Sequence, residues 1–270
     1  MPSIVSAIQR WITHPELRPY QMGEPEWFAA QNRLYDSKPL VRRCYDLWHG
    51  LLLADTDSVG QAGVVIELGS GLSRLKQKRP SILTSDVVQG AVDLLADGRA
   101  LPFRDGSVRA ILLTHVFHHI PDVEAFFREA DRVLQPGGVI SMVDCAHTPF
   151  SRFFFGSIHP EPYRADSATW SFPAGHTMLD SNQALTWIVF VRDRKRFESL
   201  FPDLSIEQRT WLPWFSYLLS GGVNLRSFVP PGFGWLVRIL DSVLRPLDPL
   251  CAIHWHWTIR KSRGSVAAKD

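Results

Sequence analysis

The chain has 270 residues, of which 45% are apolar, and a formal net charge of +2. This length holds one large α/β domain with an added segment, or two small domains. The near balance of charge argues against an extended basic surface for nucleic acid, and no apolar run of about 18 residues predicts a transmembrane helix. Cys44, Cys145 and Cys251 are scattered, which favours a reduced, intracellular setting, and the first residues do not resemble a secretory signal.

The N-terminal part of the chain is predicted to be helical. A short amphipathic pattern over residues 4–12 predicts a helix that we interpret as a packing arm, with an interfacial or lid helix as the alternative. Apolar residues then recur at helical spacing over 25–55, and Pro39 lies near the start of the second helix there, where proline is tolerated. Residues 55–63 are expected to form a polar loop.

Short β-branched runs alternate with helical segments in the middle of the chain. Strands are predicted over 64–68, 82–85, 91–96, 108–114 and 139–143, and 135–138 is predicted to be a turn. Residues 73–80 have room for one or two helical turns, and a longer helix over 122–134 is capped by Asp122. This alternation predicts an α/β fold with a doubly wound, mostly parallel sheet, whose ligand lies outside the carboxyl ends of the strands.

The rest of the chain departs from this alternation. Residues 146–225 are rich in proline and aromatic residues, and we interpret them as a cap inserted after the fifth strand, with strands predicted at 187–191 and 205–211 and a helix at 193–200. A helix over 233–244, with Leu236, Ile239, Leu240 and Val243 facing inward, and a strand over 252–259 complete the sheet. The predicted units are therefore an N-terminal helical arm (1–58), a ligand-binding core (59–145), the cap (146–225) and a C-terminal unit (226–270).

Acidic residues end the first three predicted strands. Glu67, Asp86 and Asp97 would therefore line one edge of an open α/β sheet. Gly69 and Gly71 allow the backbone to approach a ligand, and Asp86 suits the two hydroxyls of a ribose. A nicotinamide dinucleotide site uses the same features, but the third glycine of that fingerprint is absent and the helix that follows is short and basic, which disfavours it.

Five segments in this order resemble the motifs of class I S-adenosylmethionine-dependent methyltransferases, in the small-molecule type 11 branch. They are residues 67–71, 85–87, 96–103, 114–122 and 132–138. The resemblance covers about residues 60–145, and the ordered set is far more specific than any one segment. Residues 150–225 are similar to a bacterial subgroup that has a His-x-Glu-Pro segment, here at 159–162. The sequence departs from the family at Ser73, where a third glycine is usual, and in a shorter spacing between Glu67 and Asp86.

The resemblance implies S-adenosylmethionine as cofactor and S-adenosylhomocysteine as product. Its implied cofactor-binding residues are Glu67, Gly69, Ser70, Gly71, Asp86, Val87, Asp97, Gly98, Thr114, His115 and His119. Within this set Glu67 orients the first loop, Asp86 holds the ribose hydroxyls and Asp97 takes the adenine amino group. The candidate catalytic residues are His115, His159 and Glu161. For His115 a pocket-lining role is the alternative to a general base, and for His159 and Glu161 the alternative is a structural loop turn.

The predicted function is transfer of a methyl group to a small-molecule or lipid- or glycan-linked acceptor, by in-line displacement at oxygen or nitrogen. The alternative is a non-catalytic cofactor-binding or scaffold protein of the same fold. Nucleic acid is not predicted as a partner, because no Asn/Asp-Pro-Pro-Tyr-like motif follows the fourth strand. No metal site is predicted, since His254 and His256 lack a marked third ligand. The predicted location is cytoplasmic, and the apolar segments 212–219 and 235–244 leave open a peripheral contact at the inner membrane face.

Overall fold

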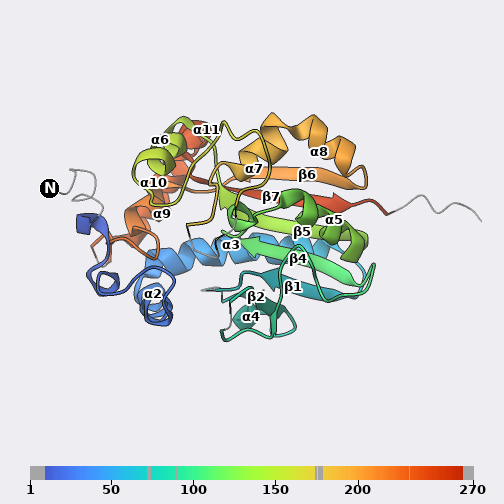
Figure 1. The fold of residues 1–270 in the computed structure, drawn as a ribbon. Coiled ribbons are helices and arrows are strands. Elements are labelled where there is room, and N and C mark those ends of the chain that lie inside the picture. The colour runs from blue at the N-terminus through green and yellow to red at the C-terminus, as the bar shows by residue number, and fades with distance from the viewer. Residues whose placement is uncertain are drawn as a thin grey trace, which may run out of the picture.

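A seven-stranded sheet forms the centre of the molecule (Figure 1). The structure is a computed structural model that describes residues 10–71, 74–88, 90–173, 175, 179–230 and 232–263. The strands, in sheet order, are β3 (Leu94–Leu95), β2 (Leu83–Asp86), β1 (Val64–Leu68), β4 (Val108–Thr114), β5 (Leu134–Cys145), β7 (His254–Lys261) and β6 (Leu204–Trp211). Strands β3 to β5 are parallel, and β7 is antiparallel to both of its neighbours. This topology confirms the predicted doubly wound, mostly parallel α/β fold.

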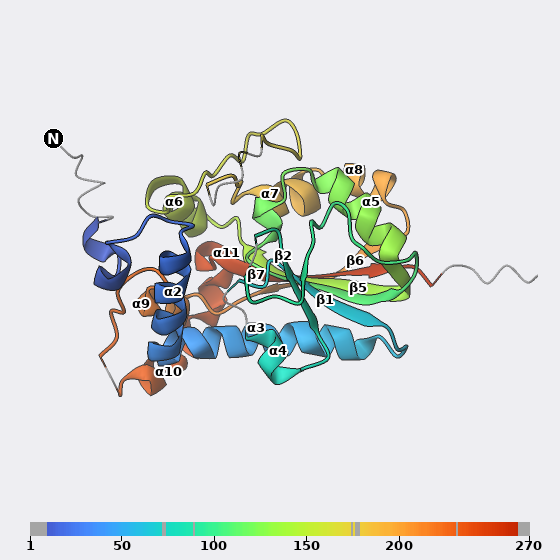
Figure 2. The same cartoon turned by 60° about the horizontal axis from the view of Figure 1, so that its bottom comes forward.

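Helices cover both faces of the sheet and one of its ends. They are α2 (Pro25–Ser37), α3 (Pro39–Ser58), α4 (Leu75–Lys78), α5 (Val123–Val133), α6 (Pro149–Ser157), α7 (Leu185–Trp187), α8 (Arg194–Leu200), α9 (Phe215–Ser220), α10 (Gly234–Leu244) and α11 (Asp248–Cys251). Figure 2 shows α3 and α4 on one face and α5, α7 and α8 on the other. The helices α2, α6, α9, α10 and α11 gather at the end where β5 leads into α6.

Several predicted elements are confirmed, and local interactions explain some of their bounds. Strands β1 and β4 have the predicted bounds, and Pro39 is the first residue of α3. The Asp122 carboxylate caps α5 by accepting a hydrogen bond from the amide of Ala125 at 3.0 Å. The segment after β1 forms only the single-turn helix α4, as its polar composition predicted. Residues 4–9 of the predicted N-terminal helix and Ser73 lie outside the described residues.

Three predictions about local structure are wrong. Residues 135–138 continue β5 instead of forming a turn, because a register shift against β4 accommodates them. Residues 187–191 belong to α7 and to the π-helical turn η3 (Ile188–Arg192), since a short buried apolar run does not by itself distinguish strand from helix. Helix α3 continues to Ser58, into the predicted loop.

The C-terminal third departs from the prediction in two further places. The strand predicted at 205–211 is confirmed as β6, but it lies at the edge of the sheet, whereas the sequence assigned it to the cap. Helix α10 has the predicted position, but Leu236, Ile239 and Val243 are exposed, and Val237 is its one buried residue. The face that was expected to pack inward is therefore open to solvent. The division of the chain into four units otherwise remains a prediction.

Asp55 joins α3 to the neighbouring strands β5 and β7. Its Oδ2 atom accepts hydrogen bonds from Ser141 Oγ at 2.6 Å and from Thr258 Oγ1 at 2.8 Å, and lies 2.9 Å from His256 Nε2. Burial would raise the pKa of Asp55, but the hydrogen bonds from His256, Ser141 and Thr258 outweigh burial and lower it. The Asp55 carboxylate of α3 therefore bonds the polar side chains that β5 and β7 direct toward this helix.

We expect Asp55→Ala to destabilise the protein by about 3 kcal/mol, because it leaves the buried groups of β5 and β7 without an acceptor. Asp57→Ala is the matched control on the same helix: the Asp57 side chain is exposed and pairs with Arg79, so its loss costs at most about 1 kcal/mol. Urea denaturation measures both. Because the pKa of Asp55 is lowered, its contribution is present above pH of about 4 and is lost in more acidic solution, where the two variants should converge. Equal destabilisation at pH 7 would contradict the role of Asp55.

Candidate active site

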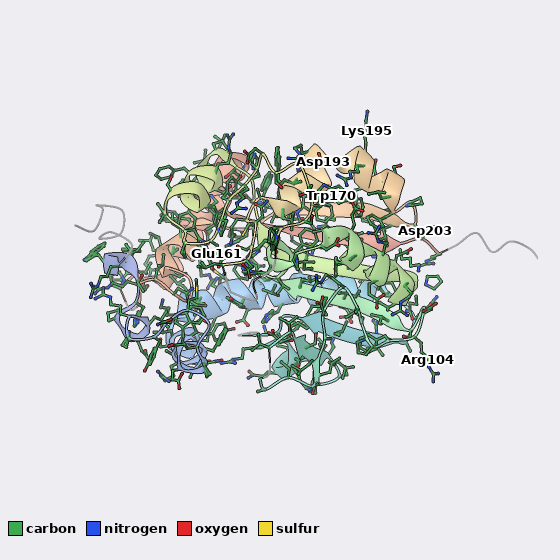
Figure 3. The ribbon with its side chains drawn as sticks, in the orientation of Figure 1. Arg104, Glu161, Trp170, Asp193, Lys195 and Asp203 are labelled. Atoms are coloured by element: carbon green, nitrogen blue, oxygen red, sulfur yellow. The ribbon has the colours of Figure 1, made fainter. Side chains whose placement is uncertain are left out.

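The site lies at the carboxyl ends of the parallel strands. Strands β1, β2, β4 and β5 end at or beside Glu67, Asp86, Thr114 and Asp144, so these side chains share one edge of the sheet. Figure 3 places Glu161 at this end of the sheet, whereas Arg104 and Asp203 lie at the opposite end. The predicted site residues from the sheet and from the cap therefore occupy the same side of the molecule.

The loop after β1 has a backbone that requires glycine. Gly69 has a φ of +58°, and a Cβ atom there would lie 2.5 Å from Val116 Cγ2. Gly71 also has a positive φ. Between them, the amide of Ser70 donates to the carbonyl of Ser85 at 2.8 Å, and the amide of Ser85 donates to Ser70 Oγ at 3.1 Å. The loop is thus fixed between the ends of β1 and β2 with its backbone turned toward the edge of the sheet.

Glu67 and Asp86 differ in their exposure. Glu67 is 1% exposed and lies near the carboxyl end of β1. Asp86 is only partly buried at the end of β2, and one of its oxygens accepts a hydrogen bond from the amide of Val88 at 3.2 Å. The neighbouring Val87 is 69% exposed, so an apolar side chain and a carboxylate lie side by side at the surface of the site.

Asp97 is held by an ion pair that the sequence did not indicate. Its Oδ1 atom accepts a hydrogen bond from the amide of Arg99 at 2.9 Å, and its Oδ2 atom lies 2.6 Å from Arg99 Nη2. A ligand amino group at Asp97 would therefore share the carboxylate with the guanidinium. The adjacent Gly98 packs closely, because a Cβ atom there would lie 3.2 Å from Leu68 and from Phe126.

His115 occupies a strained position at the end of β4. It has a φ of +57°, the left-handed region that a non-glycine residue adopts at a cost. Its ring lies 4.5 Å from that of His254 and 4.9 Å from that of Trp48. Among the described residues, the buried Nε2 atom has no hydrogen-bond partner. Burial lowers the pKa of His115 to about 4, so its imidazole is neutral at pH 7.

The aromatic surroundings of His115 were missed in the sequence. His254 begins β7, Trp48 lies in α3 and Tyr217 in α9, three elements that are remote from one another along the chain. The ring of Tyr217 lies 4.6 Å from that of His254. Burial also lowers the pKa of His254 well below its usual value. The sequence left a solvent-facing or a packing role open for His254 and His256, and both are buried. It did not indicate the proximity of His254 to the site.

His118 and Asp144 form a buried hydrogen-bonded pair. His118 Nδ1 lies 2.7 Å from Asp144 Oδ1, and both side chains are almost completely inaccessible. Burial alone would lower the pKa of His118, but the carboxylate of Asp144 outweighs it and raises that pKa well above its usual value. The same pairing keeps the pKa of Asp144 low in spite of burial. The pair connects the end of β5 to the short helix η2 (Phe117–His119).

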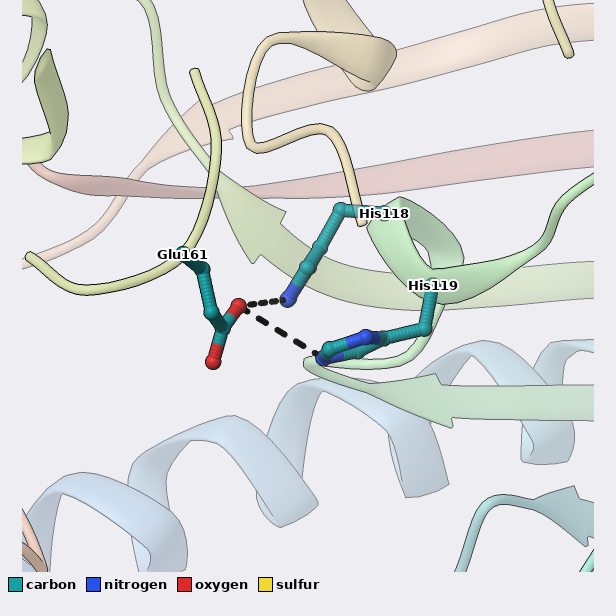
Figure 4. A group of neighbouring side chains, drawn as sticks. All are labelled: His118, His119 and Glu161. Carbon is teal, nitrogen blue, oxygen red and sulfur yellow. Dashed lines mark ion pairs between the residues drawn. The ribbon is translucent and has the colours of Figure 1, made fainter. Parts of the chain in front are cut away.

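The cap brings Glu161 to the two adjacent histidines. Glu161 Oε2 lies 3.4 Å from His118 Nε2 and 3.6 Å from His119 Nε2 (Figure 4). Burial would raise the pKa of Glu161, yet the neighbouring histidines, His118 foremost, lower it to about 2. The amide of Glu161 donates to His159 Nδ1 at 3.3 Å. Glu161 therefore lies close to both His159 and His119. The sequence assigned His119 to the cofactor and the other two to catalysis, and it did not predict these contacts.

The central part of the chain is similar to a known protein family. Residues 70–142 match the family described as "Methyltransferase domain". The norajmaline N-methyltransferase of Rauvolfia serpentina is 27% identical over 136 residues, which cover 47% of this chain and 46% of that enzyme. The chain thus matches slightly less than half the length of that relative.

Two solved structures have a similar arrangement of elements at low identity. The geranyl diphosphate C-methyltransferase of Streptomyces coelicolor A3(2) is 14% identical, with a TM-score of 0.44, over 80% of this chain and 76% of that one. A SAM-dependent methyltransferase from Archaeoglobus fulgidus is 12% identical, with a TM-score of 0.46, over 80% of this chain and 94% of that one. At these scores they bear on neither acceptor nor mechanism.

We expect Gly69→Ala to destabilise the protein by about 2 kcal/mol, because alanine is strained at positive φ and its methyl group meets Val116. Gly50→Ala is the matched control. Gly50 lies within α3 with nothing near its missing Cβ, so alanine there should stabilise by about 0.5–1 kcal/mol. Thermal and urea unfolding report both changes. Loss of stability in Gly50→Ala with none in Gly69→Ala would contradict this account of the loop.

Proposed function

We propose that this chain, which carries a class I S-adenosylmethionine-dependent methyltransferase domain, transfers a methyl group to a small-molecule acceptor held beneath the cap. The proposal is supported by three groups that lie at the same edge of the sheet: the Gly69–Gly71 backbone, Asp86 and the Thr114–His115 pair. These features are typical of a site that binds a nucleoside: a turn that requires glycine, a carboxylate at the surface and a strained residue after the fourth strand.

The residues at this edge fit S-adenosylmethionine. Asp86 is accessible enough to accept hydrogen bonds from ribose hydroxyls, and the exposed Val87 supplies an apolar surface for adenine. Among the described residues, the buried hydroxyl of Thr114 has no hydrogen-bond partner, so it can serve a ligand. The pairing of Asp97 with Arg99 is the one feature that competes with the expected contact to the adenine amino group.

When bound, S-adenosylmethionine supplies a methyl group that its sulfonium already activates. The protein must then align the acceptor and exclude water. In this proposal the cap residues His159 and Glu161 would contact the acceptor, and His115 would line the site as a neutral imidazole. With a pKa of about 4, His115 is a weak general base. An amine acceptor in its neutral form needs no such base, whereas a hydroxyl acceptor needs activation from another group.

We expect the wild-type protein to bind S-adenosylhomocysteine, and Asp86→Ala to weaken that binding by about 10–100-fold, because hydrogen bonds to a charged acceptor are lost. Isothermal titration calorimetry measures the affinity. Asp105→Ala is the control: Asp105 is an exposed carboxylate before β4, at the opposite end of the sheet from the site. Wild-type affinity in Asp86→Ala would contradict the assigned ribose contact. Failure of the wild type to bind either S-adenosylmethionine or S-adenosylhomocysteine would favour the non-catalytic alternative.

We propose further that the acceptor is linked to a lipid. This is supported by the apolar face of α10, which is exposed to solvent. Trp235, Ile239 and Val243 are 50–64% exposed on this helix. Arg238 lies on the same helix, and Arg43 of α3 lines a shallow surface hollow together with Trp235 and Ile239. Exposed tryptophan and aliphatic residues beside arginines suit the interface of a membrane that contains anionic lipid. Within the described parts of the chain, no helix has the length and apolar character needed to span a bilayer.

We expect the double variant Trp235→Ser/Ile239→Ser to lose co-sedimentation with vesicles of phosphatidylglycerol and phosphatidylcholine, since it removes the apolar contact with the interface. Leu200→Ser, which changes an exposed leucine on α8, should sediment like the wild type. Binding should also weaken in high salt, because arginines contribute to it. If the wild type does not sediment with anionic vesicles, the membrane contact is refuted while methyl transfer to a soluble acceptor remains in place.

A further inference from the structure

The side chains of His118, His119 and Glu161 converge on one point between the sheet and the cap. Figure 4 shows both imidazoles directed at the Glu161 carboxylate, from two successive residues of η2. One potential ligand atom from each of these three side chains lies within 4.8 Å of the other two. Three potential ligand atoms from segments more than 40 positions apart in the sequence therefore surround one small volume.

The separations in this group match ligands that share a metal ion better than hydrogen bonds. Glu161 Oε2 lies 3.4 Å from His118 Nε2 and 3.6 Å from His119 Nε2. A charge-assisted hydrogen bond between such atoms is about 2.7–2.9 Å long. Two ligands that are each about 2.1 Å from a tetrahedral metal ion are about 3.4 Å apart.

The opposite side of each imidazole is already engaged. His118 Nδ1 lies 2.7 Å from the carboxylate of Asp144, and His119 Nδ1 lies 3.3 Å from the carbonyl oxygen of Asp180. Each Nδ1 can thus carry the proton, which leaves the lone pair of each Nε2 directed at the shared volume. Metal-binding histidines characteristically donate their second nitrogen to a carboxylate or a backbone carbonyl. Glu161 is oriented as well, because the Gln183 side-chain amide donates to its carboxylate.

We propose that His118, His119 and Glu161 bind a divalent transition-metal ion such as Zn²⁺ or Fe²⁺. Two imidazoles and one carboxylate are a ligand set that suits these ions and leaves coordination positions open. An oxygen of the acceptor would bind at an open position of the metal ion. This role in acceptor binding rests on the proposed methyl transfer, whereas metal binding itself does not. A metal-bound hydroxyl loses its proton more readily, which would provide the activation that the weakly basic His115 does not.

Cobalt titration tests the site directly. We expect the EDTA-treated, full-length protein to take up a single Co²⁺ with the intense visible absorption of four- or five-coordinate cobalt, and metal analysis to find zinc or iron in protein that was not treated with EDTA. His119→Gln and Glu161→Gln should each weaken Co²⁺ binding by at least about tenfold. His147→Gln is the matched control. Its ring lies in the same region but stacks on Trp187 at 3.9 Å and contacts Tyr163, so it should bind cobalt normally.

The proposal would be overturned if Co²⁺ kept the weak absorption spectrum of the hydrated ion when mixed with the folded wild type. It would also be overturned if both variants bound Co²⁺ with the wild-type affinity. The cluster would then be a charge network in which a protonated His118 lies between two carboxylates. Circular dichroism checks that each variant is folded. Calorimetry with S-adenosylhomocysteine in EDTA separates the two proposals, because a protein that binds this nucleoside but no cobalt retains the proposed function and lacks the metal site.

Discussion

The buried hydrogen bond between His118 and Asp144 fixes the geometry of the carboxyl edge. Asp144 can remain charged in the interior only because an imidazole and backbone amides face it. The pair joins the end of β5 to the turn after β4, and that turn directs His118 and His119 toward the cap. Removing one partner would leave the other buried without compensation, so the floor of the site and the attachment of the cap depend on the same interaction.

The edge of the sheet is supported from the opposite side by aromatic packing. Trp48 of α3, Tyr217 of α9 and His254 of β7 surround the ring of His115, and they hold it where the backbone would otherwise avoid a positive φ. A strained residue persists only where its surroundings determine its position. Helices far from the loop after β1 therefore contribute to the shape of the site through their contacts with His115.

The sequence predicted the parallel core well because its local signals and its tertiary environment agree. The runs that became β1 and β4 are buried on both faces, and Asp122 marks the start of α5 by capping chemistry. The errors arose where one pattern suits two environments. The apolar residues 187–191 pack as a helix, and α10 presents its apolar side to solvent. The approach of Glu161 to His118 follows from folding of the cap over the sheet, which no local spacing encodes.

The position of β7 has a consequence for how the molecule is made. This strand follows β6 in the sequence but lies between β5 and β6 in the sheet, so β6 has no partner in the sheet until β7 pairs with it. During synthesis from the N-terminus, the strands up to β5 can assemble early, whereas β6 must wait until β7 has been made. The floor of the site, which includes His254, is likewise incomplete until then. A ribosome-bound chain that lacks β7 would expose the unpaired backbone N–H and C=O groups at this edge of β5, and such an edge can pair wrongly with another strand.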